Sequence, residues 1–159
     1  MTAFNKQSFS KRFATMGDPA EAAFDQVHPK NHSLGLQRPP FFMGGMLATM
    51  RQTPDRMTRD ALWECMGVGR DRKLKLKLDK LDVLEVWNEH IGPVFLFVWD
   101  SHKQRYYEAA IGDWRARVRE HGIERKFEND GKRYHELDVS HFPSDPHELP
   151  PLPEVAEAA

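Results

Sequence analysis

The pattern of apolar and polar positions predicts a chain of mixed α and β structure. The stretch "DPAEAAFDQV" opens with an acidic residue and a proline, a combination that starts helices, and Asp18 is its expected N-cap. The continuous apolar run "VFLFVWD" over 94–100 is typical of a strand buried on both faces. Residues 104–111, "QRYYEAAI", follow across a short polar turn and should pair with that strand.

Two segments on either side of a tight turn predict a β-hairpin ahead of the buried strand. Residues 51–57 and 61–68 are the expected strands, and 58–60 form the turn between them. Upstream, 34–38 is expected to be a short strand, followed by an irregular, methionine-rich connection that contains prolines and glycines.

The segment "DRKLKLKLDKLDVLEVWNE" has two competing periodicities. Its first half alternates leucine with lysine, as a strand does, but the whole segment is too long for one strand. Leu74, Leu78, Leu81 and Leu84 fall at helical spacing. The interpretation adopted is one helix over 71–89, ended by the Gly-Pro pair that follows.

Beyond the buried strands, the sequence predicts one more helix and one more hairpin. Asp113 is the expected cap of a helix that stops at His121 and Gly122. The "NDG" sequence at 129–131 is typical of a hairpin turn. The order of elements therefore indicates an α/β fold with a mixed sheet, not an alternating doubly wound one.

The last residues, 141–159, are acidic and rich in proline. Five prolines between Pro143 and Pro153 argue against a strand ladder or a helix interior, so this tail is expected to be extended or disordered. The expected organisation is a flexible arm at 1–15, a single folded domain at 16–140, and this tail. Docking of a partner through the tail's "PPLP" is an alternative role.

Composition narrows the functional classes without choosing one. A length of 159 residues suits a single domain, and a single cysteine excludes a disulfide framework and suits a reducing cytoplasm. The polar N-terminus shows no secretory signal, and the longest apolar run is too short to cross a membrane. The formal charge of −1 becomes +3 for the first 140 residues once the four acidic residues of the tail are set aside, which permits nucleic-acid binding.

Three carboxylates are candidates for holding a divalent metal ion. Asp55 and Glu64 lie on the two sides of the predicted hairpin, so both can reach one metal ion, and the Cys65 carbonyl could add an oxygen. Glu21, on the first helix, could approach from the side. Glu21 also suits a helix capping box, and Asp55 after proline is a common turn residue. Glu64 is harder to explain structurally, because an unpaired carboxylate in an apolar strand is costly.

A run of six basic residues follows this hairpin and is a candidate surface for DNA. A cation in the first turn of a helix opposes the helix dipole, which is easier to understand if phosphate or the carboxylates face it. A solvated helix face explains such a run about as well. The candidate DNA-binding residues are Arg70, Arg72, Lys73, Lys75, Lys77 and Lys80.

These features together resemble the PD-(D/E)XK nuclease superfamily, and more narrowly the phage-encoded endonuclease I type of Holliday-junction resolvase. The residues that carry the resemblance are Glu21, the "TPD" that contains Asp55, and "ECMG", which begins at Glu64. The resemblance implies a restriction-endonuclease-like core in which helices flank a mixed sheet of four to five strands. It also implies a Mg²⁺ or Mn²⁺ cofactor, metal ligation by Asp55, Glu64, Glu21 and the Cys65 carbonyl, branched DNA as substrate, and a homodimer.

Met66 stands where the superfamily has a lysine that acts on the attacking water. A thioether cannot replace an ammonium group, so the expectation is that Lys75, or failing that Lys73, reaches the same space from downstream. Three alternatives stay open: an inactive DNA-binding or virion structural protein with the same fold, another nuclease of the superfamily, and a module that binds through its tail.

Overall fold

The computed structural model describes residues 17–34 and 52–152. Its helices are α2 (Asp18–Val27), α4 (Lys80–His90) and α5 (Ile111–His121). Its strands are β1 (His32–Ser33), β2 (Arg56–Met57), β3 (Leu62–Val68), β4 (Lys73–Lys77), β5 (Val94–Asp100), β6 (Arg105–Ala110), β7 (Ile123–Lys126), β8 (Arg133–Asp138) and β9 (His147–Glu148). None of the helices in these ranges is long and apolar enough to cross a membrane.

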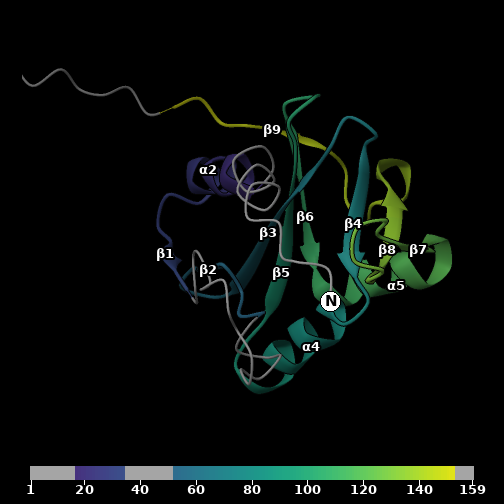
Figure 1. Ribbon diagram of the computed structural model, residues 1–159. Helices are drawn as coiled ribbons and strands as arrows, with labels where there is room; N and C mark the ends of the chain where they lie inside the picture. Colours follow the sequence, from purple (N-terminus) through teal and green to yellow (C-terminus); the bar gives the residue numbers. More distant parts are fainter. Residues whose placement is uncertain (1–16, 35–51, 153–159) are drawn as a thin grey trace, which may run out of the picture.

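The main sheet has six strands in the order β1-β2-β3-β5-β6-β9 (Figure 1). Its centre is the parallel pair β3–β5, and every other pairing is antiparallel, so the sheet is mixed. Helix α2 covers one face, where Phe24 packs with Trp63 and Phe97. Helices α4 and α5 cover the other face, where Leu84 and Trp114 join the main core.

This architecture confirms the predicted fold class, an α/β fold with a mixed sheet flanked by helices. It is consistent with a restriction-endonuclease-like core. The main sheet has six strands where four to five were expected, and three of the six, β1, β2 and β9, have only two residues each. The buried strand, its antiparallel partner, the helix ending before Gly122 and the final hairpin are confirmed. The strand expected over 51–57 is limited to Arg56–Met57, and 35–38 lies outside the described residues.

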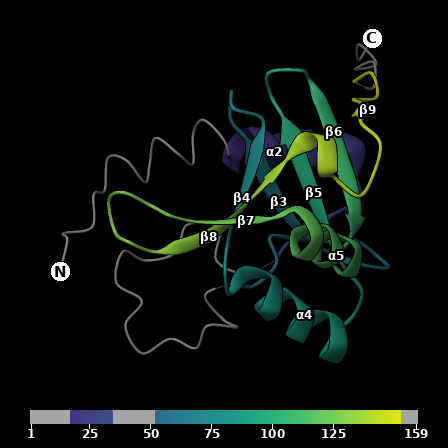
Figure 2. The ribbon, with the colours of Figure 1, turned by 90° about the vertical axis from the view of Figure 1, so that its right-hand side faces the viewer.

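The predicted helix over 71–89 is wrong in its first half. Residues Lys73–Lys77 form strand β4, and the helix begins only at Lys80. Strand β4 pairs antiparallel with β8, which pairs with β7, so these three strands form a second sheet (Figure 2). Strand β4 explains why leucine and lysine alternate in this segment. Leu74 and Leu76 are fully buried in the main core, while Lys75 and Lys77, on the other face of the strand, are exposed.

The proline-rich tail is partly ordered, contrary to the expectation that it forms no ladder. His147 and Glu148 pair with Tyr106 and Arg105 at the edge of the main sheet. Ahead of them, Phe142 is a core residue, so the folded unit extends past the boundary expected at 140. The prolines are compatible with this pairing because β9 is an edge strand of only two residues.

The turn between β3 and β4 is anchored on a buried carboxylate. Asp100, which is fully buried, accepts hydrogen bonds from the backbone N–H groups of His102 and Lys103, each at 3.1 Å. Its other oxygen accepts from Arg72 Nε at 3.1 Å. Arg72 itself has a positive φ of 55°, which the turn requires. Arg72 therefore links the turn between β3 and β4 to the turn after β5 through Asp100. The sequence predicted a contact with DNA instead.

Candidate active site

The hairpin brings Asp55 and Glu64 together as predicted from the sequence. Asp55 directly precedes β2, and Glu64 lies in the middle of β3, one residue beyond the partner of Arg56. Asp55 Oδ2 accepts a hydrogen bond of 2.9 Å from the backbone N–H of Cys65. Burial raises the pKa of Asp55, although Lys80, the Cys65 N–H group and Arg56 act in the opposite direction.

Glu64 is the most confined of these carboxylates. It is 5% exposed, and within the described part of the chain its Oε2 atom has no hydrogen-bond partner. Burial raises the pKa of Glu64 to about 8, and the negative charges of Asp55 and Glu21 add to the effect. Buried polar atoms almost always have a partner, so this oxygen calls for an explanation.

Lys80 supplies the positive charge beside the two acids. It is the first residue of α4, its side chain is 17% exposed, and its Nζ atom forms an ion pair with Glu64 Oε1. Burial alone would lower the pKa of Lys80, but the carboxylates of Glu64 and Asp55 outweigh burial and raise it. The ammonium group therefore stays charged at neutral pH.

Lys73 and Lys75 lie elsewhere, although one of them was expected beside the carboxylates. Lys73 Nζ bonds Glu136 at 3.1 Å, and Lys75 Nζ lies 3.2 Å from Asp71. Both side chains project from strand β4 on the face opposite its buried leucines. Lys80 becomes available in their place because the chain turns at Leu78 and Asp79 and starts helix α4.

Met66, which stands where the resemblance predicts a lysine, is a packing residue. It shares a strand face with Leu62 and Glu64, as the alternation of β3 predicts, and it packs against the main core. The apolar side chain of Met66 thus contacts other apolar side chains.

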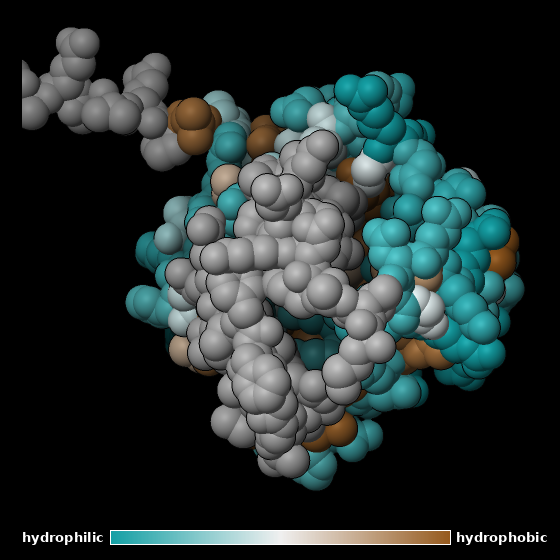
Figure 3. All heavy atoms as spheres, viewed as in Figure 1, coloured by the Kyte–Doolittle hydropathy of each residue, from teal (hydrophilic) through white to brown (hydrophobic). Residues whose placement is uncertain are grey.

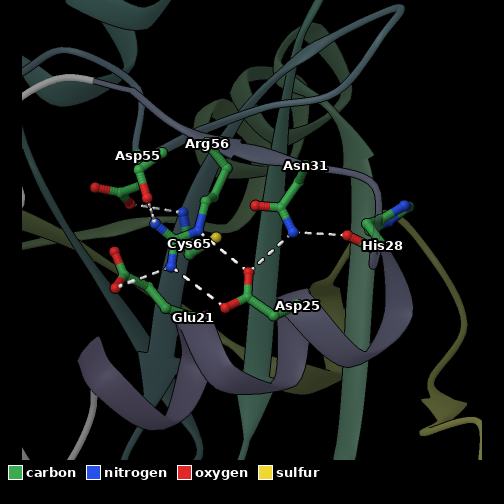
Figure 4. A network of polar contacts seen from close by, with 8 residues as sticks. Glu21, Asp25, His28, Asn31, Asp55, Arg56 and Cys65 are labelled. Atoms are coloured by element: carbon green, nitrogen blue, oxygen red, sulfur yellow. Dashed lines mark hydrogen bonds and ion pairs between the residues drawn. The ribbon is translucent and has the colours of Figure 1, made fainter. Parts of the chain in front are cut away.

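Glu21 reaches the site from the first turn of α2 through an arginine that sequence reasoning missed. Arg56 is 6% exposed, and its Nη2 atom lies 3.5 Å from Glu21 Oε2. It also bonds Asp25 Oδ1 at 3.3 Å (Figure 4). A further bond of 2.6 Å joins it to Ser33 Oγ. Burial raises the pKa of Glu21, and the charge of Asp55 adds to this. Within the described residues the Glu21 side chain pairs with Arg56, so Glu21 belongs to this network.

With all three carboxylates ionised, the cluster would carry a net negative charge. Three carboxylates, those of Glu21, Asp55 and Glu64, face two cations, Lys80 and Arg56, and Arg56 also serves Asp25. Like charges this close raise each other's pKa values, and either a proton or a further cation relieves the repulsion.

Cys65 contributes through its backbone. Its thiol is buried on the α2 side of the sheet with Trp63, and burial holds the pKa of the thiol well above its usual value. A thiol held neutral in this way is not a nucleophile. The backbone N–H group of Cys65 holds Asp55 in place, and a metal contact by its carbonyl stays a prediction.

Three of the other predicted DNA-binding residues, Arg72, Lys73 and Lys75, are bound to carboxylates outside the candidate site. Arg70 and Lys77 are exposed, and Lys75 is exposed beside Asp71. Arg72 is held by Asp100 in the fold. The six residues predicted to form one DNA-binding surface are thus divided among a turn, a strand and a helix start.

The donor set fits a hard divalent cation in part. Among residues 17–34 and 52–152, no three His, Cys, Asp or Glu side chains gather closely enough to enclose a metal ion. Magnesium, however, often takes only one or two carboxylates and keeps several waters. Asp55 and Glu64 offer such a pair, with a buried oxygen of Glu64 that lacks a partner in the described region.

The comparisons with known proteins add a distant likeness. No protein-family model and no curated protein sequence matches the chain. Among the solved structures, a distant likeness is found. It is to the 1.6 Å structure of Archaeoglobus fulgidus Hjc, a Holliday junction resolvase from an archaeal hyperthermophile. The likeness covers 80% of this chain and 90% of that chain, with a TM-score of 0.41 and 11% sequence identity. A likeness at these values carries no conclusion about the activity of this chain.

Stability should depend on pH through Glu64. Because its pKa rises from 4.5 to about 8 on folding, the stability linked to its proton is complete below pH 4.5 and is lost as the pH rises through 8. Glu64→Gln should remove this part of the pH dependence, so the variant should lose less stability than wild type as the pH rises through 8. Urea unfolding between pH 4 and 9, with the exposed Glu89→Gln as control, measures the effect. Parallel curves for wild type and Glu64→Gln would contradict it.

Proposed function

We propose that the protein is a metal-dependent endonuclease that hydrolyses phosphodiester bonds in DNA, with Asp55, Glu64 and Lys80 at its centre. The observation that carries the proposal is the buried Glu64 carboxylate, which lies beside Asp55 and has only Lys80 as an ion-pair partner among the described residues. Such a costly arrangement is typical of a functional site, where groups with shifted pKa values gather.

Asp55 and Glu64 would hold the metal ion, Mg²⁺ or Mn²⁺, with Glu21 and the Cys65 carbonyl as further oxygen ligands. The bound ion would supply stabilisation of negative charge on the phosphoryl group and a more acidic attacking water. The hydrogen bond from the Cys65 N–H group fixes one oxygen of Asp55, so that this carboxylate is oriented before substrate binds.

Lys80 would perform the role that Met66 cannot. Its ammonium group has three N–H donors and carries a positive charge that does not depend on the metal. Held at the start of α4 beside Glu64, it can donate a hydrogen bond to the attacking water or to a phosphate oxygen. This role replaces the expectation for Lys75 and Lys73, whose ammonium groups are bound to Asp71 and Glu136.

The proposed substrate is branched DNA, and the proposed assembly is a homodimer, because symmetric cleavage of two strands needs two sites. A phage resolvase that acts in DNA recombination would have these properties. Arg70, Lys73, Lys75 and Lys77 would bind the DNA backbone on the way to the site.

Cleavage of labelled DNA tests the substrate and the chemistry together. The protein is expected to nick a four-way junction in Mg²⁺ or Mn²⁺, to do nothing in EDTA, and to cut a linear duplex of the same sequence at least about tenfold more slowly. Binding without cleavage in either metal would favour the inactive DNA-binding alternative. Equal rates on junction and duplex would favour another nuclease of the superfamily.

A further inference from the structure

The outer face of the second sheet carries a cluster of basic side chains. The register places Lys75 opposite Glu136 and Lys77 opposite Tyr134, and Tyr134 lies opposite Arg125 on β7. Residues that are partners across strands share a face, so Lys73, Lys75, Lys77 and Arg125 project to the same side. Leu74, Leu76 and Leu137 project to the other side, where they are fully buried in the main core. Asp138, the register partner of Lys73, lies on the same side. We call the four basic residues, with Glu136 and Asp138, the β4–β7 basic face.

Glu136 holds two of these cations in a defined position. Its Oε1 atom accepts from Lys73 Nζ at 3.1 Å and from Arg125 Nε at 3.0 Å. Glu136 is 7% exposed, whereas the Arg125 side chain is 48% exposed. Burial alone would raise the pKa of Glu136, but the hydrogen bonds from Lys73 and Arg125 lower it. One carboxylate therefore orients two cations and neutralises only one of them.

Arg125 is the residue of this face best placed to bind an anion. Its Nε atom is bound to Glu136, so the guanidinium plane is fixed, and its two terminal nitrogens form no hydrogen bond or ion pair that involves the described residues. A planar group with two parallel N–H donors matches a phosphate. Phe127 stacks on Tyr134 with ring centroids 4.2 Å apart, so an aromatic pair supports the end of the hairpin beside Arg125.

The position of this face suits a long polyanion. Strand β4 ends at Lys77, three residues before Lys80 of the candidate active site. The basic side chains of β4 therefore begin close to that site in the sequence and continue along the strand. The β7–β8 hairpin extends from the body of the protein (Figure 2). Over β4, β7, β8 and α5 the surface is largely hydrophilic (Figure 3). Helices α4 and α5 pack on the opposite side of the second sheet.

We propose that the β4–β7 basic face binds the phosphate backbone of DNA outside the scissile site, with Arg125, oriented by Glu136, as its main phosphate contact. The identity of the nucleic acid rests on the proposed function. The site itself rests on the charge of this face and on the geometry around Glu136. In this proposal the β7–β8 hairpin also binds DNA, through Arg125, which is not one of the basic residues between 70 and 80 that the sequence predicted to do so.

Binding of a labelled four-way junction in EDTA, followed by fluorescence anisotropy at several salt concentrations, tests this proposal apart from cleavage. Arg125→Ala should weaken binding about fivefold to tenfold and lower the slope of log affinity against log salt by about one. The matched control is Arg133→Ala, on the same hairpin but one residue from Tyr134 and hence on the opposite face. It removes the same charge and should change affinity less than about twofold.

Two further variants distinguish a loss of affinity caused by the orientation of Arg125 or by unfolding from a loss caused by the removed charge alone. Arg125→Lys keeps the charge but cannot both bond Glu136 and offer a planar pair of donors, so it should recover only a small part of the lost affinity. Lys75→Ala, which leaves the Glu136 contacts intact, should weaken binding about threefold without lowering the thermal unfolding midpoint. Equal losses in Arg125→Ala and Arg133→Ala, or no loss in Arg125→Ala and Lys75→Ala, would overturn the proposal. Tight binding without cleavage would uphold it while contradicting the proposed hydrolysis.

Discussion

Asp55→Asn is expected to lower the rate of DNA cleavage by at least about a hundredfold while leaving the fold intact. The asparagine oxygen can still accept the hydrogen bond from the Cys65 N–H group, so the local structure is retained. The substitution removes one of the two negative charges that would hold the metal ion, and such losses reduce metal affinity and activity steeply. Single-turnover cleavage of a labelled junction in Mg²⁺ measures the effect.

Asp60→Asn is the matched control for this substitution. Asp60 lies in the turn of the same hairpin, and its side chain is 90% exposed beside Arg59. Asp60→Asn removes the same charge but leaves Asp55 and Glu64 unchanged, so this variant should cleave at the wild-type rate. If Asp55→Asn also cleaves at that rate, Asp55 is not part of the catalytic site and the activity has another source.

Lys80→Met is expected to reduce the maximal rate of cleavage by about a hundredfold, comparable to the loss of one preorganised donor in other active sites. Methionine retains much of the aliphatic length of the side chain but removes the ammonium group beside Glu64. Because a competing cation is gone, binding of Mn²⁺ should be retained or become tighter. A merely structural role for Lys80 would not produce this division between cation binding and rate.

Two comparisons decide whether Lys80 is the displaced lysine. Lys103→Met, in the exposed turn after β5, is the control for the general effect of losing a lysine and should leave the rate unchanged. Lys75→Met should weaken DNA binding but reach the wild-type rate at saturating DNA, because Lys75 is bound to Asp71. Wild-type rates in Lys80→Met, together with a large loss of maximal rate in Lys75→Met, would restore the original expectation.

The carboxylate part of the site could be predicted from the sequence because it depends on local structure. Asp55 and Glu64 lie on the two sides of a short hairpin whose turn is evident from the residues between them. The alternation of β3 also predicts that Glu64 and Met66 share a face away from Trp63 and Cys65. Burial of Glu64 followed from its apolar neighbours in the same strand.

The position of Lys80 could not be predicted from the sequence, because the segment 71–89 fits both a strand periodicity and a helix periodicity. Leucines at alternate positions of a strand also recur every four residues, so Leu74 and Leu78 satisfy both patterns. The contact that decides between them is the pairing of β4 with β8, whose residues lie about 60 positions further along the chain. The position of Lys80 at the start of α4 depended on that choice, and so did the proposal that Lys80 takes the role expected of Lys75.

Arg56 was missed for a different reason. A charged residue after Pro54-Asp55 gives no sign in the sequence that it is buried, since arginine is mostly exposed. Its burial follows from three partners on distant elements, which are Glu21 and Asp25 on α2 (Figure 4) and Ser33 on β1. The signal that could have indicated it is the presence of two acids one helical turn apart in α2, which need a cation on the facing strand.

The most direct test of the central claim is the binding of Mn²⁺ to the purified protein, measured by electron paramagnetic resonance at pH 8.5, where Glu64 is largely ionised. The account predicts saturable binding by wild type that is lost in both Asp55→Asn and Glu64→Gln and retained in Asp60→Asn. Absence of binding by wild type, or equal binding by all four proteins, would contradict the assignment of Asp55 and Glu64 as the metal-holding pair.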